Sequence, residues 1–192
     1  MSAASRAAAG MASDILPRSM TEHALLTPTP RDRVALAGPP DPRDLAGDFG
    51  HRASVDVRFA DTDAMGHVNN AAYLTYVELA RIDWWTARTG ELLEREPGRD
   101  QGLILAEAEI AFRSPVFFGE TVVVETRPGR LGRTSIGLEH RLTASRDGGP
   151  SRVAAICRSV LVRYDYAAER PMPWPSELIE LIEAVEGPLD RS

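Results

Sequence analysis

Apolar and polar side chains alternate along residues 55–59 (VDVRF), and the pattern then changes to a helical spacing. Alternation over so short a stretch predicts a strand. Residues 71–88 instead place apolar side chains three or four positions apart, which predicts a helix with one apolar face. The positions on that face are Tyr73, Val77, Ala80 and Trp84. Asn69 or Asn70 is a competent N-cap for this helix, and Gly90 supplies its end.

Four longer runs in the second half of the chain have the composition of strands. The runs are GLILAEAEIAFRS, ETVVVETRPGR, TSIGLEHRLTAS and SRVAAICRSVLVRYD. The turn sequences SPVFFG, GRLGR and RDGG separate them, as expected of antiparallel hairpins. Residues 173–187 predict a short C-terminal helix. A strand, a long helix and a run of antiparallel strands bury their apolar faces best when the sheet curls around the helix, which is an α+β fold.

Residues 1–50 show neither the alternation typical of a strand nor the spacing typical of a helix, and they are rich in alanine and then in proline. Such a segment cannot bury enough apolar surface to offset the entropy of ordering it. We therefore predict a disordered arm over residues 1–50 and one domain over residues 51–192. A transit peptide is an alternative, although the acidic residues of the arm argue against it. A start codon placed too early is another, since Met11 and Met20 lie inside the arm.

Composition narrows the classes of function. A net charge of −6 and a pI near 5.3 argue against a nucleic-acid partner, which requires a positive surface. No apolar run approaches the length of a membrane span, so no membrane partner is expected. The single cysteine, Cys157, lies in a strand-like run, which favours a structural thiol in a reducing cytoplasm.

The segment between the first strand and the helix, FADTDAMGHVNN (residues 59–70), carries most of the candidate chemistry. It combines two carboxylates, a glycine, a histidine and two asparagines directly before a helix start. The first amides of a helix lack intrahelical acceptors and lie at the positive end of its dipole. Without further context, Asp61 and Asp63 are better explained as aspartates that form a turn than as catalytic groups.

This segment with its helix, FADTDAMGHVNNAAYLTYVELAR, and the later EIAFRSPVFFGETVVVETRPGRLGRTS resemble the hotdog-fold acyl-CoA thioesterases of the 4-hydroxybenzoyl-CoA thioesterase type. The resemblance covers about residues 55–175. It implies a hotdog fold, in which a curved antiparallel sheet wraps around a long central helix. It also implies hydrolysis of an acyl-CoA thioester to free acid and coenzyme A, with no metal or other cofactor. Assembly into a homodimer or homotetramer is expected with it.

The resemblance gives roles to residues of the segment. Asp63, the second aspartate of the DxD pattern, would be either the general base for a water or the nucleophile itself. The backbone amide of Asn70 would polarise the thioester carbonyl. Gly66 would let the substrate approach the backbone closely. His67 either positions substrate or water or makes a structural hydrogen bond, and Asn69 is either a cap or a substrate contact.

Phosphate groups of coenzyme A call for cationic side chains, and all 22 basic residues are arginine. Arg130 and Arg133 flank the turn in PGRLGR, and Arg113 ends a strand, so these are the candidates for substrate binding. The segment also resembles the plant acyl-carrier-protein thioesterases, in which an asparagine stands at the position of Met65. Any role that needs an amide at this position is therefore absent here.

Three further polar residues have structural interpretations. Asp61 is expected to hold the loop. Glu78 could be a helix-borne carboxylate of the site, but an ion pair with Arg81 is favoured. His140 is expected to be a hydrogen-bonded histidine inside a strand.

Other functions remain open at this stage. The nearest is hydrolysis of a thioester carried by an acyl-carrier protein. A hotdog enoyl-CoA hydratase is less favoured because its motif is not seen. A binding module that holds an acyl ligand without turnover is the alternative from a different class.

Overall fold

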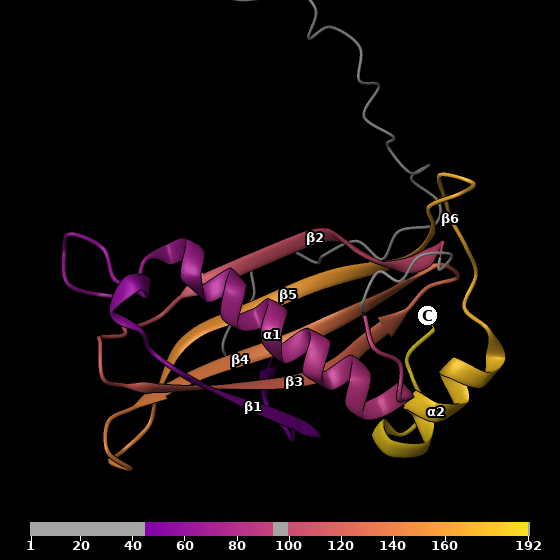
Figure 1. Cartoon of the computed structure of the whole chain (residues 1–192). Helices are drawn as coiled ribbons and strands as arrows, with labels where there is room; N and C mark the ends of the chain where they lie inside the picture. Colours follow the sequence, from indigo (N-terminus) through magenta and orange to yellow (C-terminus); the bar gives the residue numbers. More distant parts are fainter. Residues whose placement is uncertain (1–44, 94–99, 192) are drawn as a thin grey trace, which may run out of the picture.

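The structure is a computed structural model that describes residues 45–93 and 100–191. Its strands form one antiparallel sheet in the order β1-β3-β4-β5-β2, and β6 pairs with β5 (Figure 1). The elements are β1 (His51–Asp56), the 3₁₀ helix η2 (Phe59–Asp61), α1 (Asn70–Thr89), β2 (Gln101–Phe112), β3 (Thr121–Leu131), β4 (Ser135–Ser145), β5 (Arg152–Asp165), β6 (Arg170–Pro171) and α2 (Ser176–Glu186).

Helix α1 lies along one face of the curved sheet and packs against β1 and β3, with α2 beside its C-terminal end (Figure 1). Trp84 and Trp85 are adjacent in sequence and both are fully buried, because side chains of the sheet and of α2 pack around the pair. The fold class predicted from the sequence, a curved antiparallel sheet around a long helix, is confirmed. Neither helix of the described residues is long and apolar enough to cross a membrane.

A row of polar side chains crosses the sheet over β3, β4 and β5. His140 Nδ1 lies 3.0 Å from Thr126 Oγ1, and its Nε2 lies 3.0 Å from Ser159 Oγ. All three residues are fully buried. Burial lowers the pKa of His140 to about 3, so its imidazole is neutral at physiological pH. The hydrogen-bonded strand histidine predicted at this position is confirmed.

Strand β2 forms one edge of the sheet and is irregular at its middle. Leu105 pairs with Leu161 and Glu107 with Val160, so Ala106 is an extra residue on β2. Such a β-bulge bends the strand and changes which side chains share a face. No described strand lies on the outer side of β2.

The predicted arm of residues 1–50 lies mostly outside the described residues, but residues 45–50 are described and contact the sheet. Leu45 and Phe49 are 1% and 8% exposed. The guanidinium of Arg127 lies 4.6 Å from the centre of the Phe49 ring. The packed domain therefore begins earlier than the predicted boundary at residue 51, because two isolated apolar side chains anchor a segment that has no periodic pattern.

Candidate active site

Backbone hydrogen bonds close the loop between η2 and α1 into a compact turn. Asp63 N–H donates to the His67 carbonyl at 2.9 Å, and Gly66 N–H donates to the Asp63 carbonyl at 3.0 Å. Gly66 has a φ of 82°, a left-handed conformation that glycine adopts without a steric penalty. The turn thus returns the chain so that His67 lies beside Asp63.

The carboxylate of Asp63 has a different neighbour at each oxygen. Oδ1 accepts a hydrogen bond from Met65 N–H at 2.8 Å, and Oδ2 lies 3.4 Å from Nδ1 of His67. The side chains of Asp63 and His67 are 19% and 30% exposed, so solvent or a small ligand can reach both. One oxygen is fixed by the backbone, and the other remains available beside an imidazole.

Helix α1 begins directly after this loop. Asn69 caps it, because its Oδ1 accepts from Ala71 N–H and its carbonyl accepts from Ala72 N–H, both at 2.9 Å. The cap role predicted for Asn69 is confirmed, whereas a substrate contact by this residue stays a prediction. Within the described residues, no acceptor faces the amide of Asn70, which lies at the positive end of the helix dipole.

Asp61 is buried beneath the loop and is surrounded by donors. Its carboxylate accepts from Arg58 Nη2 at 2.7 Å, from Arg58 N–H at 2.9 Å and from the Tyr76 hydroxyl at 2.9 Å. These hydrogen bonds, with that of Arg58 foremost, lower the pKa of Asp61 to about 2. The structural role predicted for Asp61 is consistent with this geometry, but sequence reasoning missed Arg58 and Tyr76. The spacing of three residues between Arg58 and Asp61 was the available signal.

A second loop, between β2 and β3, supports the first. His67 and Phe117 form an isolated antiparallel bridge, and Val68 N–H donates to the Val116 carbonyl at 2.7 Å. The second loop is itself held by Glu120, whose Oε2 accepts from Phe117 N–H at 2.9 Å. The loop that carries Asp63 and His67 is therefore held by its own backbone hydrogen bonds and by the loop between β2 and β3.

Exposed aromatic rings and guanidinium groups surround the two loops. Phe59 is 76% exposed and Phe118 is 54% exposed, and their ring centres are 5.9 Å apart. Arg58 pairs with buried Asp61, and Arg152 pairs with buried Glu120. In each pair the carboxylate is inside and the guanidinium reaches solvent, so the surface beside Asp63 presents aromatic rings and guanidinium groups. None of these aromatic residues was singled out from the sequence.

Arg130 and Arg133 are not brought to this loop within one chain. Strand β3 begins beside the loop, where Thr121 pairs with Asp56, and Arg130 lies near its opposite end. At about 3.3 Å per residue, this separation is roughly 30 Å. In Figure 1 the loop before α1 lies at the left end of the molecule and α2 at the right.

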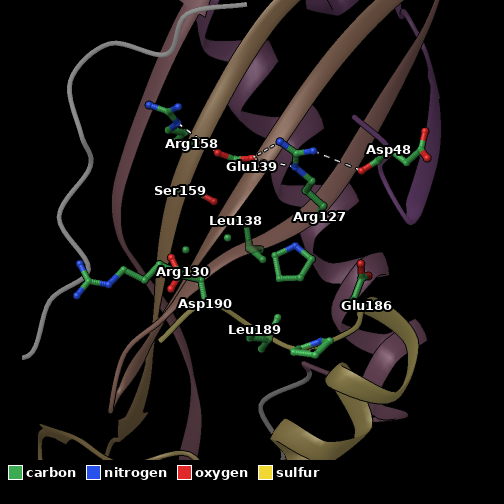
Figure 2. Close-up of a pocket in the computed structure, with 14 residues that line it drawn as sticks. Asp48, Arg127, Arg130, Leu138, Glu139, Arg158, Ser159, Glu186, Leu189 and Asp190 are labelled. Atoms are coloured by element: carbon green, nitrogen blue, oxygen red, sulfur yellow. Dashed lines mark hydrogen bonds and ion pairs between the residues drawn. The ribbon is translucent and has the colours of Figure 1, made fainter. Parts of the chain in front are cut away.

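Arg130 instead borders a cavity of about 630 Å³ between the sheet and the segment that follows α2 (Figure 2). Figure 2 shows Arg127 between Glu139 and the backbone of Asp48, while Arg130 extends away from them. Arg127 and Arg158 share Glu139, at 2.8 Å and 3.6 Å. Carboxylates and guanidiniums are nearly balanced around this cavity, so its charge does not favour a phosphate.

Glu78 and Arg81 form the ion pair predicted from the sequence, with 3.6 Å between Glu78 Oε1 and Arg81 Nη2. Arg81 is 7% exposed, and burial lowers its pKa.

Across the described part of the chain, no group of three or more histidine, cysteine, aspartate or glutamate side chains lies close enough to hold a metal ion.

Comparison with known proteins places this loop in a family context. A thioesterase from Thermus thermophilus, complexed with coenzyme A and Zn, is 37% identical over 73% of this chain and 96% of its own, with a TM-score of 0.60. A putative thioesterase from Pseudomonas aeruginosa is 35% identical over 70% of this chain and 99% of its own, with a TM-score of 0.61. A mutant 4-hydroxybenzoyl-CoA thioesterase complexed with 4-hydroxybenzoyl-CoA shares the fold at 17% identity, covering 68% of this chain and 96% of its own, with a TM-score of 0.59. The family model of the thioesterase-like superfamily matches residues 57–182, which include η2, the loop and α1. The chain therefore belongs to the thioesterase-like superfamily.

Proposed function

We propose that the protein is an acyl-CoA thioesterase of the 4-hydroxybenzoyl-CoA thioesterase type, which hydrolyses an acyl-CoA thioester to free acid and coenzyme A in the cytoplasm. The observation that carries the proposal is the position of Asp63, a partly exposed carboxylate on a braced loop that leads into the start of α1. A thioester requires an attacking oxygen and a donor for the charge that develops on its carbonyl oxygen. Asp63 and the Asn70 amide supply these two groups.

Two routes are compatible with this arrangement. In the first, Asp63 takes a proton from a water whose oxygen attacks the carbonyl carbon; the C–S bond breaks, and the proton passes to the thiolate of coenzyme A. In the second, the Asp63 carboxylate attacks directly and expels the thiolate, and water then hydrolyses the mixed anhydride to restore Asp63. In both routes the Asn70 amide donates a hydrogen bond to the carbonyl oxygen. Loss of such a donor typically costs about 10²-fold to 10³-fold in rate.

His67 and Gly66 complete the proposed site. His67 lies 3.4 Å from Oδ2 of Asp63, where it can orient the carboxylate or a water next to it. Gly66 has no side chain, and nothing lies within 4 Å of the position that a Cβ would occupy. Substrate can therefore approach the loop backbone at this residue. Asn69, which caps α1, is three residues further along the same loop and is the second candidate for a substrate contact there.

The surface around the loop supports an anionic, partly apolar substrate. Arg58 is 71% exposed at its side chain and Arg152 is 36% exposed, next to the aromatic pair of Phe59 and Phe118. Within one chain, these arginines are better placed for the phosphates of coenzyme A than Arg130 and Arg133 are. The latter two could reach a substrate only at the loop of another copy.

The test of the proposed function is thiol release from a panel of short, medium, long and aromatic acyl-CoAs. We expect turnover of at least one of them, and a loss of about 10²-fold or more in Asp63→Asn, because asparagine can neither accept a proton nor attack the carbonyl. The variant should keep the fold, which circular dichroism checks. A folded Asp63→Asn variant with unchanged turnover would refute the role of Asp63.

The same panel separates the alternatives. Release from acyl-carrier-protein thioesters and from none of the acyl-CoAs would make the carrier-protein thioesterase the better description. Thermal stabilisation by an acyl-CoA that is not consumed would indicate a binding module instead.

A further inference from the structure

We infer that Asp61 is the positioning residue of the site: together with Tyr76 it holds the Asp63 loop against the start of α1 and so fixes the carboxylate relative to the Asn70 amide. The inference rests on the proposed function. It concerns a residue that does not itself touch substrate, since Asp61 is only 6% exposed.

The contacts of Asp61 link Arg58, the side chain of Tyr76 and the cap residue of α1. Its Oδ2 accepts from the Tyr76 hydroxyl, which comes from the second turn of α1. Its Oδ1 accepts from Arg58, at the end of the segment that follows β1. Its backbone carbonyl accepts from Asn69 N–H, the cap residue of α1, at 2.8 Å. One residue therefore ties the loop to the helix through both its side chain and its main chain.

Asp63 lies two residues after this junction, and Asn70 lies one residue after Asn69. The carboxylate and the amide that the reaction requires are therefore both close along the chain to atoms held by Asp61. A misplacement of about 1 Å between reacting groups can cost about 10²-fold in rate. Loss of the Tyr76 hydrogen bond would remove the side-chain contact between Asp61 and α1, and the loop would then be held less tightly although Asp63 itself would be unchanged.

The charge state of this network does not change over the working range of pH. Asp61 stays ionised above about pH 4, because its hydrogen bonds with Arg58 and Tyr76 favour the carboxylate. Burial raises the pKa of Tyr76, and the Asp61 carboxylate raises it further, so the hydroxyl keeps its proton. The network thus acts through geometry and not through titration, and its loss should leave the pH profile of the reaction in place.

Glu186 provides a matched control at the opposite end of α1. Its carboxylate accepts from Trp84 Nε1 at 2.9 Å and from Arg88 Nε at 2.6 Å. Like Asp61, it has a buried carboxylate that accepts hydrogen bonds from one aromatic side chain of α1 and from one arginine. The two carboxylates differ in that only Asp61 adjoins the Asp63 loop. Changes that merely weaken the anchoring of α1 should affect the protein equally at either end.

The experiment compares Asp61→Asn, Tyr76→Phe and Glu186→Gln with the wild type, using kcat, KM and Tm with the best acyl-CoA. In Asp61→Asn we expect kcat to fall about 10-fold to 100-fold, and in Tyr76→Phe about threefold to tenfold, with KM within about threefold. Glu186→Gln should lower Tm by about as much as Asp61→Asn does. Its kcat, however, should stay within about twofold of the wild-type value. The shape of the pH–rate profile should persist in Asp61→Asn, because Asp61 stays ionised across this range in the wild type.

A readout that needs no substrate is amide hydrogen exchange of the loop. Exchange at the amides of Asp63, Gly66 and Val68 should accelerate about tenfold or more in Asp61→Asn and Tyr76→Phe, and stay near the wild-type rate in Glu186→Gln. Wild-type exchange in the first two variants would overturn the inference, even if the protein hydrolyses no acyl-CoA. Unchanged kcat in Asp61→Asn, or a kcat loss in Glu186→Gln as large as that in Asp61→Asn, would overturn it while leaving the thioesterase intact.

Discussion

Three buried or partly buried ionisable side chains show how location sets chemistry at the scale of single residues. Asp61 is ionised because donors surround it, and His140 is neutral because it is buried between two hydroxyl side chains. Asp63 has one oxygen on a backbone amide and the other beside an imidazole. Only the last combines access with an available oxygen, which is why the proposed chemistry is placed there.

Burial of His140 makes the stability of the fold depend on pH. The pKa of His140 falls from 6.5 to about 3 on folding, so below pH 6.5 the unfolded chain binds a proton that the folded chain does not. Folding stability is therefore fully present above this pH and decreases as pH falls toward 3. For one proton, we expect a slope approaching about 1.4 kcal/mol per pH unit, measured by urea unfolding between about pH 7 and pH 5.

The control is His140→Gln, whose amide can still meet Thr126 and Ser159 and does not titrate. Its stability should change less than that of the wild type over the same pH interval. An equal decrease in both proteins would assign the acid sensitivity to other groups.

At the scale of elements, the sequence pattern predicted the long helix and the long strands. It did not predict contacts that single side chains make on folding. The helix expected over residues 71–88 is α1, and the four strand-like runs are the four long strands. The helix was recognisable by the spacing of its apolar side chains, and the strands by their composition and the turn sequences between them. The DxD loop was also found from the sequence, since its residues are neighbours in the chain. Tyr76 and Arg152 were not, because only folding brings them to the loop, whereas Arg58 was overlooked although it lies three residues before Asp61. Residues 45–50 were missed because just two of their side chains are buried.

That segment leads to a prediction about Phe49. Its ring lies between the guanidiniums of Arg127 and Arg141, each 4.6 Å from the ring centre, and it packs with Leu45 and Ile156. Phe49→Ala should lower the free energy of unfolding by about 3 to 5 kcal/mol, as for other buried aromatic residues. Chemical denaturation measures this change.

The comparison variant is Phe59→Ala, since Phe59 is 76% exposed and should affect stability by less than about 1 kcal/mol. Equal stability of Phe49→Ala and the wild type would show that residues 45–50 contribute nothing to the domain. A shortened protein intended for structural work should accordingly begin before Leu45.

At the scale of the whole molecule, the long free edge of β2 favours assembly. Its outer side has no described neighbour, and Leu105 on it is 46% exposed. Exposed edges of this length are normally paired or covered. We expect a homodimer in which β2 meets β2 of a second copy, or a homotetramer built from such dimers.

Leu105→Glu tests this edge by light scattering coupled to gel filtration. It should shift the protein toward half the wild-type mass at micromolar concentration, because a carboxylate would be buried without a partner. Val185→Glu is the control, since Val185 is 61% exposed and lies on α2, outside the sheet. A wild-type protein that is already monomeric, or a Leu105→Glu variant of unchanged mass, would contradict pairing through β2.

The extra residue in β2, Ala106, bears on which strands can pair with this edge. The bulge puts the two halves of the edge out of phase, so a regular strand from another protein could follow only one half. A second copy of the same chain carries the same irregularity and, related by a two-fold axis, can match both halves. We therefore expect the edge to pair better with a second copy of the same chain than with a regular strand of another protein.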